Sequence, residues 1–230
     1  MRSTLVTALT ALVFGFGGAA LWSLSGLGND FTKSYLLDNP EILPEMAEKY
    51  EQSLVQERLA AAGDEVTRPF PGAILGNPEG SITLVKFTDY GCSFCKMSRP
   101  HIDSLIAANP ELKVVIREWP IFEGSDRPAK MALAAAQQGK FPAFHDAMFN
   151  QSSMSDDAIM SAAAEAGLDL AAAQDFINSP AAGFELSKNT NLARQLGFGG
   201  TPSWVVGSQA FEGAVGTEKL QEAIDAARES

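Results

Sequence analysis

Hydrophobic positions from residue 70 onward alternate between strand-like runs and helix-like stretches. Residues 81–88 are dense enough in β-branched and apolar residues to predict a central strand covered on both faces. Further strands are predicted at residues 73–75, 112–118, 203–206 and 209–211. Helices are predicted after the first long strand as far as Ala108, across residues 126–197, and from an N-cap at Thr217 to the C-terminus. The order is β-β-α-β, a block of helices, then β-β-α.

Residues 30–62 have a helical composition with a break at Asn39-Pro40. After the break, Leu43, Ala47, Tyr50 and Leu54 recur at spacings of four and three, which predicts a narrow apolar stripe on a charged helix. The stripe has two interpretations. It packs on the main domain, or it forms the seam of a homo-oligomer through residues 30–62.

The first 25 residues differ from the rest of the chain. No charged residue occurs between Arg2 and Asp30, and residues 5–22 are nearly all apolar or small. This pattern predicts a signal peptide, with small residues for cleavage after Ala20, or a retained N-terminal membrane anchor at the inner membrane. Either outcome places the remaining chain in the periplasm or otherwise outside the cytoplasm.

Composition and net charge limit the size of the domain and the kind of partner that this chain can have. A chain of 230 residues with 46% hydrophobic residues has room for one domain with a substantial core and a modest appendage. The formal net charge of -11 disfavours nucleic acid as a partner, because phosphates would be repelled.

The only two cysteines, Cys92 and Cys95, lie three positions apart where a predicted strand gives way to a helix. A thiolate is stabilised by free N–H groups at a helix N-terminus, so Cys92 is the expected nucleophile. Cys95 follows one turn later and would resolve the mixed disulfide. Ser93 and Phe94 between them would tune the thiolate. A staple for stability is disfavoured, because so short a loop restricts the unfolded chain little.

Two other uses of the cysteine pair are weaker. A structural zinc ion needs four ligands, and His101 and His145 do not have metal-site spacing. Inert buried thiols would leave the spacing unexplained. We therefore predict redox chemistry with no metal and no cofactor. Gly200-Thr201-Pro202 precedes a strand, where a cis proline packed opposite Cys92 would present the backbone of Thr201 to an extended substrate segment.

Together these residues resemble the DsbA-like family. The matching segments, in family order, are residues 74–78, 85–95, 114–120, 139–145 and 200–202. The resemblance implies an α/β thioredoxin-like fold formed by residues 70–125 and 198–230, with an inserted helical domain at residues 126–197 and an N-terminal helical extension. It also implies a nucleophilic Cys92, a resolving Cys95 and a cis Pro202. The segment ending at Pro40 is similar to the extension of ScsC-like members, some of which trimerise and isomerise disulfides.

The sequence departs from the family at Lys86. Many members have an acidic residue six positions before the first cysteine, where it relays protons to the buried thiol. Lys86 either points beneath the cysteines, which would lower their pKa values and its own, or packs outward along its stem. Asp89 is an alternative relay, although an aspartate at a strand end is more often solvated or capping. His145 is interpreted as a packing or capping residue.

The sequence thus predicts an extracytoplasmic thiol–disulfide oxidoreductase that exchanges its Cys92–Cys95 disulfide with exported cysteine-containing proteins and is recycled by a membrane redox partner. An oligomeric disulfide isomerase or reductase of the same fold is the alternative. A client-binding chaperone with vestigial thiols is a third hypothesis, and it does not explain why these two cysteines are present.

Overall fold

The structure is a computed structural model that describes residues 10–12, 14–18, 22 and 27–229. The chain divides into two compact units, Met1–Glu51 and Gln52–Ser230. Most of the predicted leader or anchor lies outside the described residues, so it stays a prediction. Among the residues that are described, no helix combines the length and the apolar character needed to span a bilayer.

The first unit is helical. It contains α2 (Leu27–Asp38), a short 3-10 turn η1 (Pro40–Ile42) and the start of α3 (Leu43–Ala62). The predicted break at Asn39-Pro40 is present, and the backbone of Asn39 leaves the helical region there. Proline cannot donate to the preceding turn, which explains why α2 ends before it.

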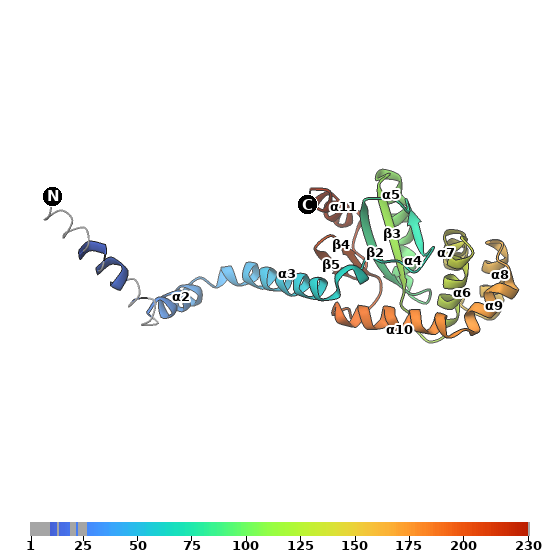
Figure 1. The fold of residues 1–230 in the computed structure, drawn as a ribbon, viewed down its shortest axis with the longest axis horizontal. Helices are drawn as coiled ribbons and strands as arrows, with labels where there is room; N and C mark the ends of the chain where they lie inside the picture. The colour runs from blue at the N-terminus through green and yellow to red at the C-terminus, as the bar shows by residue number, and fades with distance from the viewer. Residues whose placement is uncertain (1–9, 13, 19–21, 23–26, 230) are drawn as a thin grey trace. The chain divides into compact units, whose positions relative to one another are not determined.

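The second unit is built on a five-stranded sheet (Figure 1). Its strands are β1 (Ile74–Gly76), β2 (Ile82–Thr88), β3 (Leu112–Glu118), β4 (Ser203–Val206) and β5 (Gln209–Glu212). The spatial order is β1-β3-β2-β4-β5; β2 and β3 are parallel and the other pairs are antiparallel. The parallel register places Thr88 opposite Glu118, so both long strands end at the same edge of the sheet.

Side chains that alternate along the strands cover both faces of the sheet. Leu84, Val114 and Trp204 belong to the larger core, which also holds residues of α5 (Arg99–Ala108) and α11 (Thr217–Arg228). Val85 and Phe87 face the other way, into a core shared with Leu192 and Leu196 near the end of α10 (Pro180–Gln195). The prediction of a doubly covered central strand is confirmed.

Five helices lie between β3 and β4 in the sequence. They are α6 (Asp126–Gln137), α7 (Phe141–Asn150), α8 (Asp156–Glu165), α9 (Leu170–Asn178) and α10. Figure 1 shows α6, α7, α8 and α9 grouped beside the sheet. The predicted order of strands and helices is confirmed. One detail was wrong: the final helix begins at Thr217 itself, its N-cap is Gly216, and no side chain caps it.

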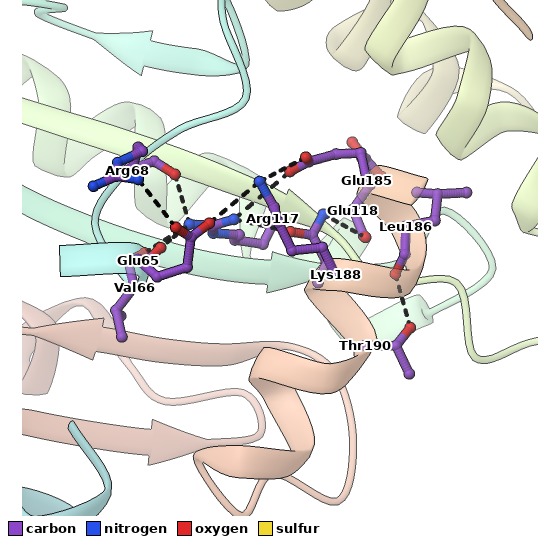
Figure 2. Close-up of polar contacts among 10 residues, drawn as sticks. Glu65, Val66, Arg68, Arg117, Glu118, Glu185, Leu186, Lys188 and Thr190 are labelled. Carbon is purple, nitrogen blue, oxygen red and sulfur yellow. Dashed lines mark hydrogen bonds and ion pairs between the residues drawn. The ribbon is translucent and has the colours of Figure 1, made fainter. Parts of the chain in front are cut away.

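A buried arginine ties the sheet to the segments that flank it (Figure 2). Arg117 on β3 is 1% exposed, and its guanidinium donates to the carbonyl oxygens of Glu65, Val66 and Arg68. It also donates to Asn189 Oδ1 at 3.0 Å and lies 3.7 Å from Glu185 Oε1 on α10. One fixed cation thus holds together the chain before β1, the sheet and the inserted helices.

Replacing Arg117 with methionine should therefore destabilise the protein strongly. The change leaves three carbonyl oxygens without their donor and Glu185 with one cation fewer, so we expect a loss of about 3 kcal/mol in the free energy of unfolding. Urea unfolding measures this loss. Lys130→Met, which removes an exposed pair with Asp126, is the control and should change stability little. An Arg117 variant as stable as this control would contradict the assignment.

Candidate active site

The sulfur of Cys92 occupies the N-cap position of α4 (Ser93–Met97). The local sequence places it there because β2 ends at Thr88 and the chain turns through Tyr90 and Gly91 into the helix. Cys92 Sγ accepts a hydrogen bond from the backbone N–H of Cys95 at 3.4 Å. A hydrogen bond from the Cys95 thiol, together with backbone N–H groups of the first turn, lowers the pKa of Cys92 to about 5. The predicted helix N-terminal position of Cys92 is confirmed.

The pKa of Cys95 is shifted in the opposite direction to that of Cys92. Cys95 has no exposed surface, and burial together with its hydrogen bond to Cys92 raises the pKa of its thiol, whereas the charge of Lys86 lowers it. The two thiols titrate as a coupled pair in which Cys92 holds the negative charge and Cys95 holds the proton. Both cysteines are free thiols in the structure. The arrangement therefore favours the thiolate at Cys92, which is 3% exposed, and the thiol at the fully buried Cys95.

Thr201 and Pro202 lie beside Cys92. The peptide bond between them is cis, as predicted, and the Cys92 sulfur lies 3.2 Å from the Thr201 carbonyl oxygen, which accepts from it only when Cys92 is protonated. Pro202 is buried and leads directly into β4. The structure therefore brings together residues that lie 109 positions apart in the sequence.

Lys86 points inward, beneath the cysteines. Its side chain is 1% exposed, and its Nζ lies 3.4 Å from the carbonyl oxygen of Cys95. The Nζ also lies over the rings of Trp204 and Phe149, at 5.3 and 5.7 Å from their centroids. Burial lowers the pKa of Lys86 to about 8, while the neighbouring Cys95 and Glu118 raise it. Of the two orientations left open by the sequence, the structure shows the inward one.

Asp89 is buried and serves the backbone. Its carboxylate accepts hydrogen bonds from the N–H groups of Gly91, Ile121 and Phe122, at 2.7, 2.6 and 3.0 Å, and from the hydroxyl of Ser125 at 2.8 Å. Neither the solvated nor the capping role weighed from the sequence is present, because Asp89 is 1% exposed and the N-cap of α4 is Cys92. These four bonds hold the turn before Cys92 against the loop after β3.

The surface around Cys92 is apolar with polar groups between. Ser93 and Phe94 are both exposed, Phe94 by 53%, and Met97 and Phe122 are exposed as well. A cavity of about 240 Å³ opens beside Cys92, lined in part by Lys96, Met148 and Met154. A Cβ at Gly91 would meet Met154 Cε at 2.9 Å, so a larger residue here would require the end of the Met154 side chain to move.

Sequence reasoning missed one buried acid. Glu118 is fully buried at the end of β3 and is close enough to Lys86 for their charges to interact. Its Oε1 accepts from Tyr90 Oη at 3.1 Å, and Tyr90 Oη lies 2.8 Å from Nδ1 of His145. The sequence predicts a packing or capping role for His145, and the structure also places it at the end of this series of hydrogen bonds. The signal that could have identified Glu118 was the pairing of two parallel strands. Glu118 is the last residue of β3, and β3 lies beside β2, the strand that leads to Cys92.

A cysteine pair at a helix N-terminus beside a cis proline, on a sheet with this topology, defines the class of thioredoxin-fold disulfide oxidoreductases. The family model of the DSBA-like thioredoxin domain matches residues 83–225. The chain belongs to this family, as the sequence resemblance indicated.

Solved structures agree with the family assignment. A thioredoxin-like oxidoreductase from Silicibacter pomeroyi DSS-3 is 39% identical, with a TM-score of 0.69 over 73% of this chain and 98% of that one. The thiol-disulfide exchange protein alpha-DsbA2 from Wolbachia pipientis is 27% identical, with a TM-score of 0.69 over 77% of this chain and 97% of that one. A linker-deletion mutant of Proteus mirabilis ScsC, 24% identical, shares the fold with a TM-score of 0.72 over 89% of this chain and 95% of that one. These likenesses confirm the predicted thioredoxin-like fold class with helical additions.

The chain also matches curated Na⁺/H⁺ antiporters over a small part of their length. The NhaA antiporter of Herminiimonas arsenicoxydans is 27% identical over 157 residues, which is 67% of this chain and 25% of the antiporter. The match therefore spans about a quarter of these relatives.

The low pKa of Cys92 predicts how alkylation depends on pH. Because the thiolate is the reactive form, the rate of iodoacetamide labelling of the reduced chain should rise with a midpoint near pH 5, well below the ordinary value of 9.0 for a cysteine. Mass mapping should place the label on Cys92 and leave buried Cys95 unlabelled. A midpoint near the ordinary value would contradict the stabilisation of the thiolate at α4.

The same shift has a consequence for stability. A folded-state pKa below the unfolded one means that the thiolate stabilises the folded reduced chain at high pH. This contribution is lost as the pH falls from about 9 to about 5.

Proposed function

We propose that this protein is an extracytoplasmic oxidase that donates its Cys92–Cys95 disulfide to exported proteins containing cysteines. The observation that supports the proposal most strongly is the position of Cys92 at the N-cap of α4, where its sulfur accepts from the Cys95 N–H at 3.4 Å and the pKa of its thiol is lowered to about 5. A stabilised thiolate favours the reduced form of the pair, and a pair that prefers to be reduced is a good oxidant of other thiols.

The reaction has two exchange steps. A client thiolate attacks Cys92 Sγ of the disulfide, and Cys95 leaves and takes up a proton. A second client thiolate then attacks the client sulfur of the mixed disulfide, and Cys92 leaves as its stabilised thiolate. The client loses two electrons and two protons; one proton ends on Cys95, the other passes to solvent, and the reduced protein holds a thiol at Cys95 and a thiolate at Cys92. A membrane redox partner that accepts two electrons would regenerate the disulfide.

The residues around Cys92 take defined roles in this proposal. Thr201 and the cis Pro202 would align an extended client segment beside Cys92 by backbone pairing. Exposed Phe94 would contact apolar client side chains, and Ser93 would modulate the thiolate. Lys86 beneath the pair would stabilise the negative charge that forms on Cys95 when that sulfur leaves.

An oligomeric isomerase or reductase is the second candidate, supported by the apolar surface of the first unit. Phe31, Leu37 and Leu43 are exposed by 71%, 71% and 66%, and a cavity of about 560 Å³ between α2 and the start of α3 is lined largely by apolar residues. Contiguous apolar surface of this kind is typical of an interface. A homo-oligomer through residues 30–62 would gather several active sites around one misfolded client.

The reduction potential of the Cys92–Cys95 pair distinguishes the two candidates. For an oxidase we expect a value near or above about -150 mV in a glutathione titration, because the reduced form is stabilised. Cys92→Ala should abolish dithiol oxidation, and Cys95→Ala should accumulate mixed disulfides with a client. A potential near about -250 mV would contradict the oxidase and favour an isomerase or reductase.

The oligomeric state gives an independent prediction. If the exposed apolar face of α2 and α3 is an interface, the full chain should sediment as a multiple of 24.4 kDa, and Leu37→Asp with Leu43→Asp should reduce it to a single chain. Phe184→Asp is the matched control, because Phe184 on α10 is also 71% exposed. A single-chain mass for the unsubstituted protein would contradict the interface.

A further inference from the structure

Glu118 is a carboxylic acid enclosed at the edge of the sheet where both long strands end. It is opposite Thr88 in the parallel register, and none of its surface is exposed. One oxygen, Oε1, accepts from Tyr90 Oη at 3.1 Å, while Oε2 has no hydrogen-bond partner among the residues that the structure describes. A buried carboxyl oxygen without a partner is costly, so a role other than packing is expected.

The series of hydrogen bonds from Glu118 through Tyr90 to His145 can change its protonation without losing a bond. Tyr90 Oη lies between Glu118 Oε1 and His145 Nδ1, at 3.1 and 2.8 Å. With a carboxylate, His145 Nδ1–H donates to Tyr90 and Tyr90 donates to Glu118. With a carboxylic acid, Glu118 donates to Tyr90 and Tyr90 donates to the other tautomer of His145. Both hydrogen bonds are therefore present in either state, and the two states differ by one proton.

The surroundings favour the uncharged forms of Glu118 and His145. Burial is the largest cause of a raised pKa at Glu118 and of a lowered pKa at His145, so a neutral acid and a neutral imidazole are both accessible. Other charged and titratable groups act on each member of the Lys86–Glu118–Tyr90–His145 set. Cys92, Cys95 and Asp103 act on Lys86, and Arg99 acts on His145. Asp89 acts on both Glu118 and Tyr90, and Asp146 acts on Tyr90.

Lys86 lies between this series of hydrogen bonds and the thiols. Its Nζ lies 3.4 Å from the carbonyl oxygen of Cys95, and the charges of Glu118 and Cys95 both act on it. The carboxylate favours the charged form of Lys86, and the charged form of Lys86 favours the thiolate of Cys95. Asp89 is not a substitute, because its carboxylate is occupied by three backbone N–H groups and the hydroxyl of Ser125.

We propose that Glu118, held by Tyr90 and His145, is a positioning residue for thiol–disulfide exchange that acts through Lys86 to set the proton affinity of Cys95. The inference rests on the proposed exchange function. When Cys95 attacks Cys92 in a mixed disulfide, its proton passes to the Lys86 amine, the Cys95–Cys92 bond forms, and the other sulfur leaves as a thiolate. Glu118 stabilises the ammonium group formed in this step.

The test is the pH dependence of two steps of one reaction. The reduced full chain is mixed with oxidised glutathione, and stopped-flow measurement separates the attack of Cys92 from the release of glutathione by Cys95. The second rate should rise with pH as the Lys86–Cys95 pair loses one proton. Glu118→Gln removes a negative charge beside Lys86, so this rising limb should move to lower pH by about one unit. The first step should keep its midpoint.

Companion variants separate this role from general stability. Glu118→Asp should restore the limb toward its original position, and Tyr90→Phe, which keeps the ring, should shift it in the direction of Glu118→Gln. In a Lys86→Met background, Glu118→Gln should have no further effect. The matched control is Glu185→Gln, another buried glutamate that pairs with Arg117 and Lys188 (Figure 2) and should leave the limb unmoved.

The outcomes are distinct. A limb that coincides for Glu118→Gln and the unsubstituted chain would overturn the proposal, as would an equal shift in Glu185→Gln. Absence of both steps in the unsubstituted chain would instead contradict the proposed function.

Discussion

The first turn of α4 holds the sulfur of Cys92, and the rest of the site depends on that contact. The backbone N–H of Cys95 lies 3.4 Å from Cys92 Sγ, and the thiol of Cys95 is directed to the same atom. Negative charge is therefore stabilised on one sulfur and excluded from the other by burial. The two thiols, identical in the chemistry of the free amino acid, acquire different proton affinities because one caps a helix and the other is buried behind it.

Holding a thiolate in this way requires a rigid frame on all sides. Asp89 fixes the turn before Cys92 by accepting from three backbone N–H groups, which leaves little freedom where β2 passes into α4. On the other side, the Thr201 carbonyl oxygen lies 3.2 Å from the sulfur and accepts from it when Cys92 is protonated. Farther away, Arg117 binds three backbone carbonyls and two side chains of α10, so the inserted helices have a fixed position on the sheet. Each of these contacts provides a partner for backbone or charged groups that would otherwise be buried without one.

Beneath the thiols, the charges are distributed in an unexpected way for this family. The position six residues before Cys92, where the sequence resemblance implied an acid, contains Lys86, and the buried acid is Glu118 on the neighbouring strand. The sheet therefore still encloses one acid below the cysteines, together with a base. The aromatic side chains of Trp204 and Phe149 surround the lysine and keep water away, which makes the interaction between the buried charges stronger than it would be at the surface.

The sequence by itself determined what depends on local pattern. Periodicity predicted the order of strands and helices, and the bounds of β3 and β4, because apolar spacing reports directly on burial. The spacing of Cys92 and Cys95 at a strand–helix junction predicted the helix N-terminal thiol, and the family motif predicted the cis peptide at Pro202. Tertiary structure alone decided the orientation of Lys86 and the meeting of Glu118, Tyr90 and His145. Those contacts arise from the register of β2 on β3 and from α7 packing over the site, and pairing between segments distant in sequence leaves no periodic signal in either one.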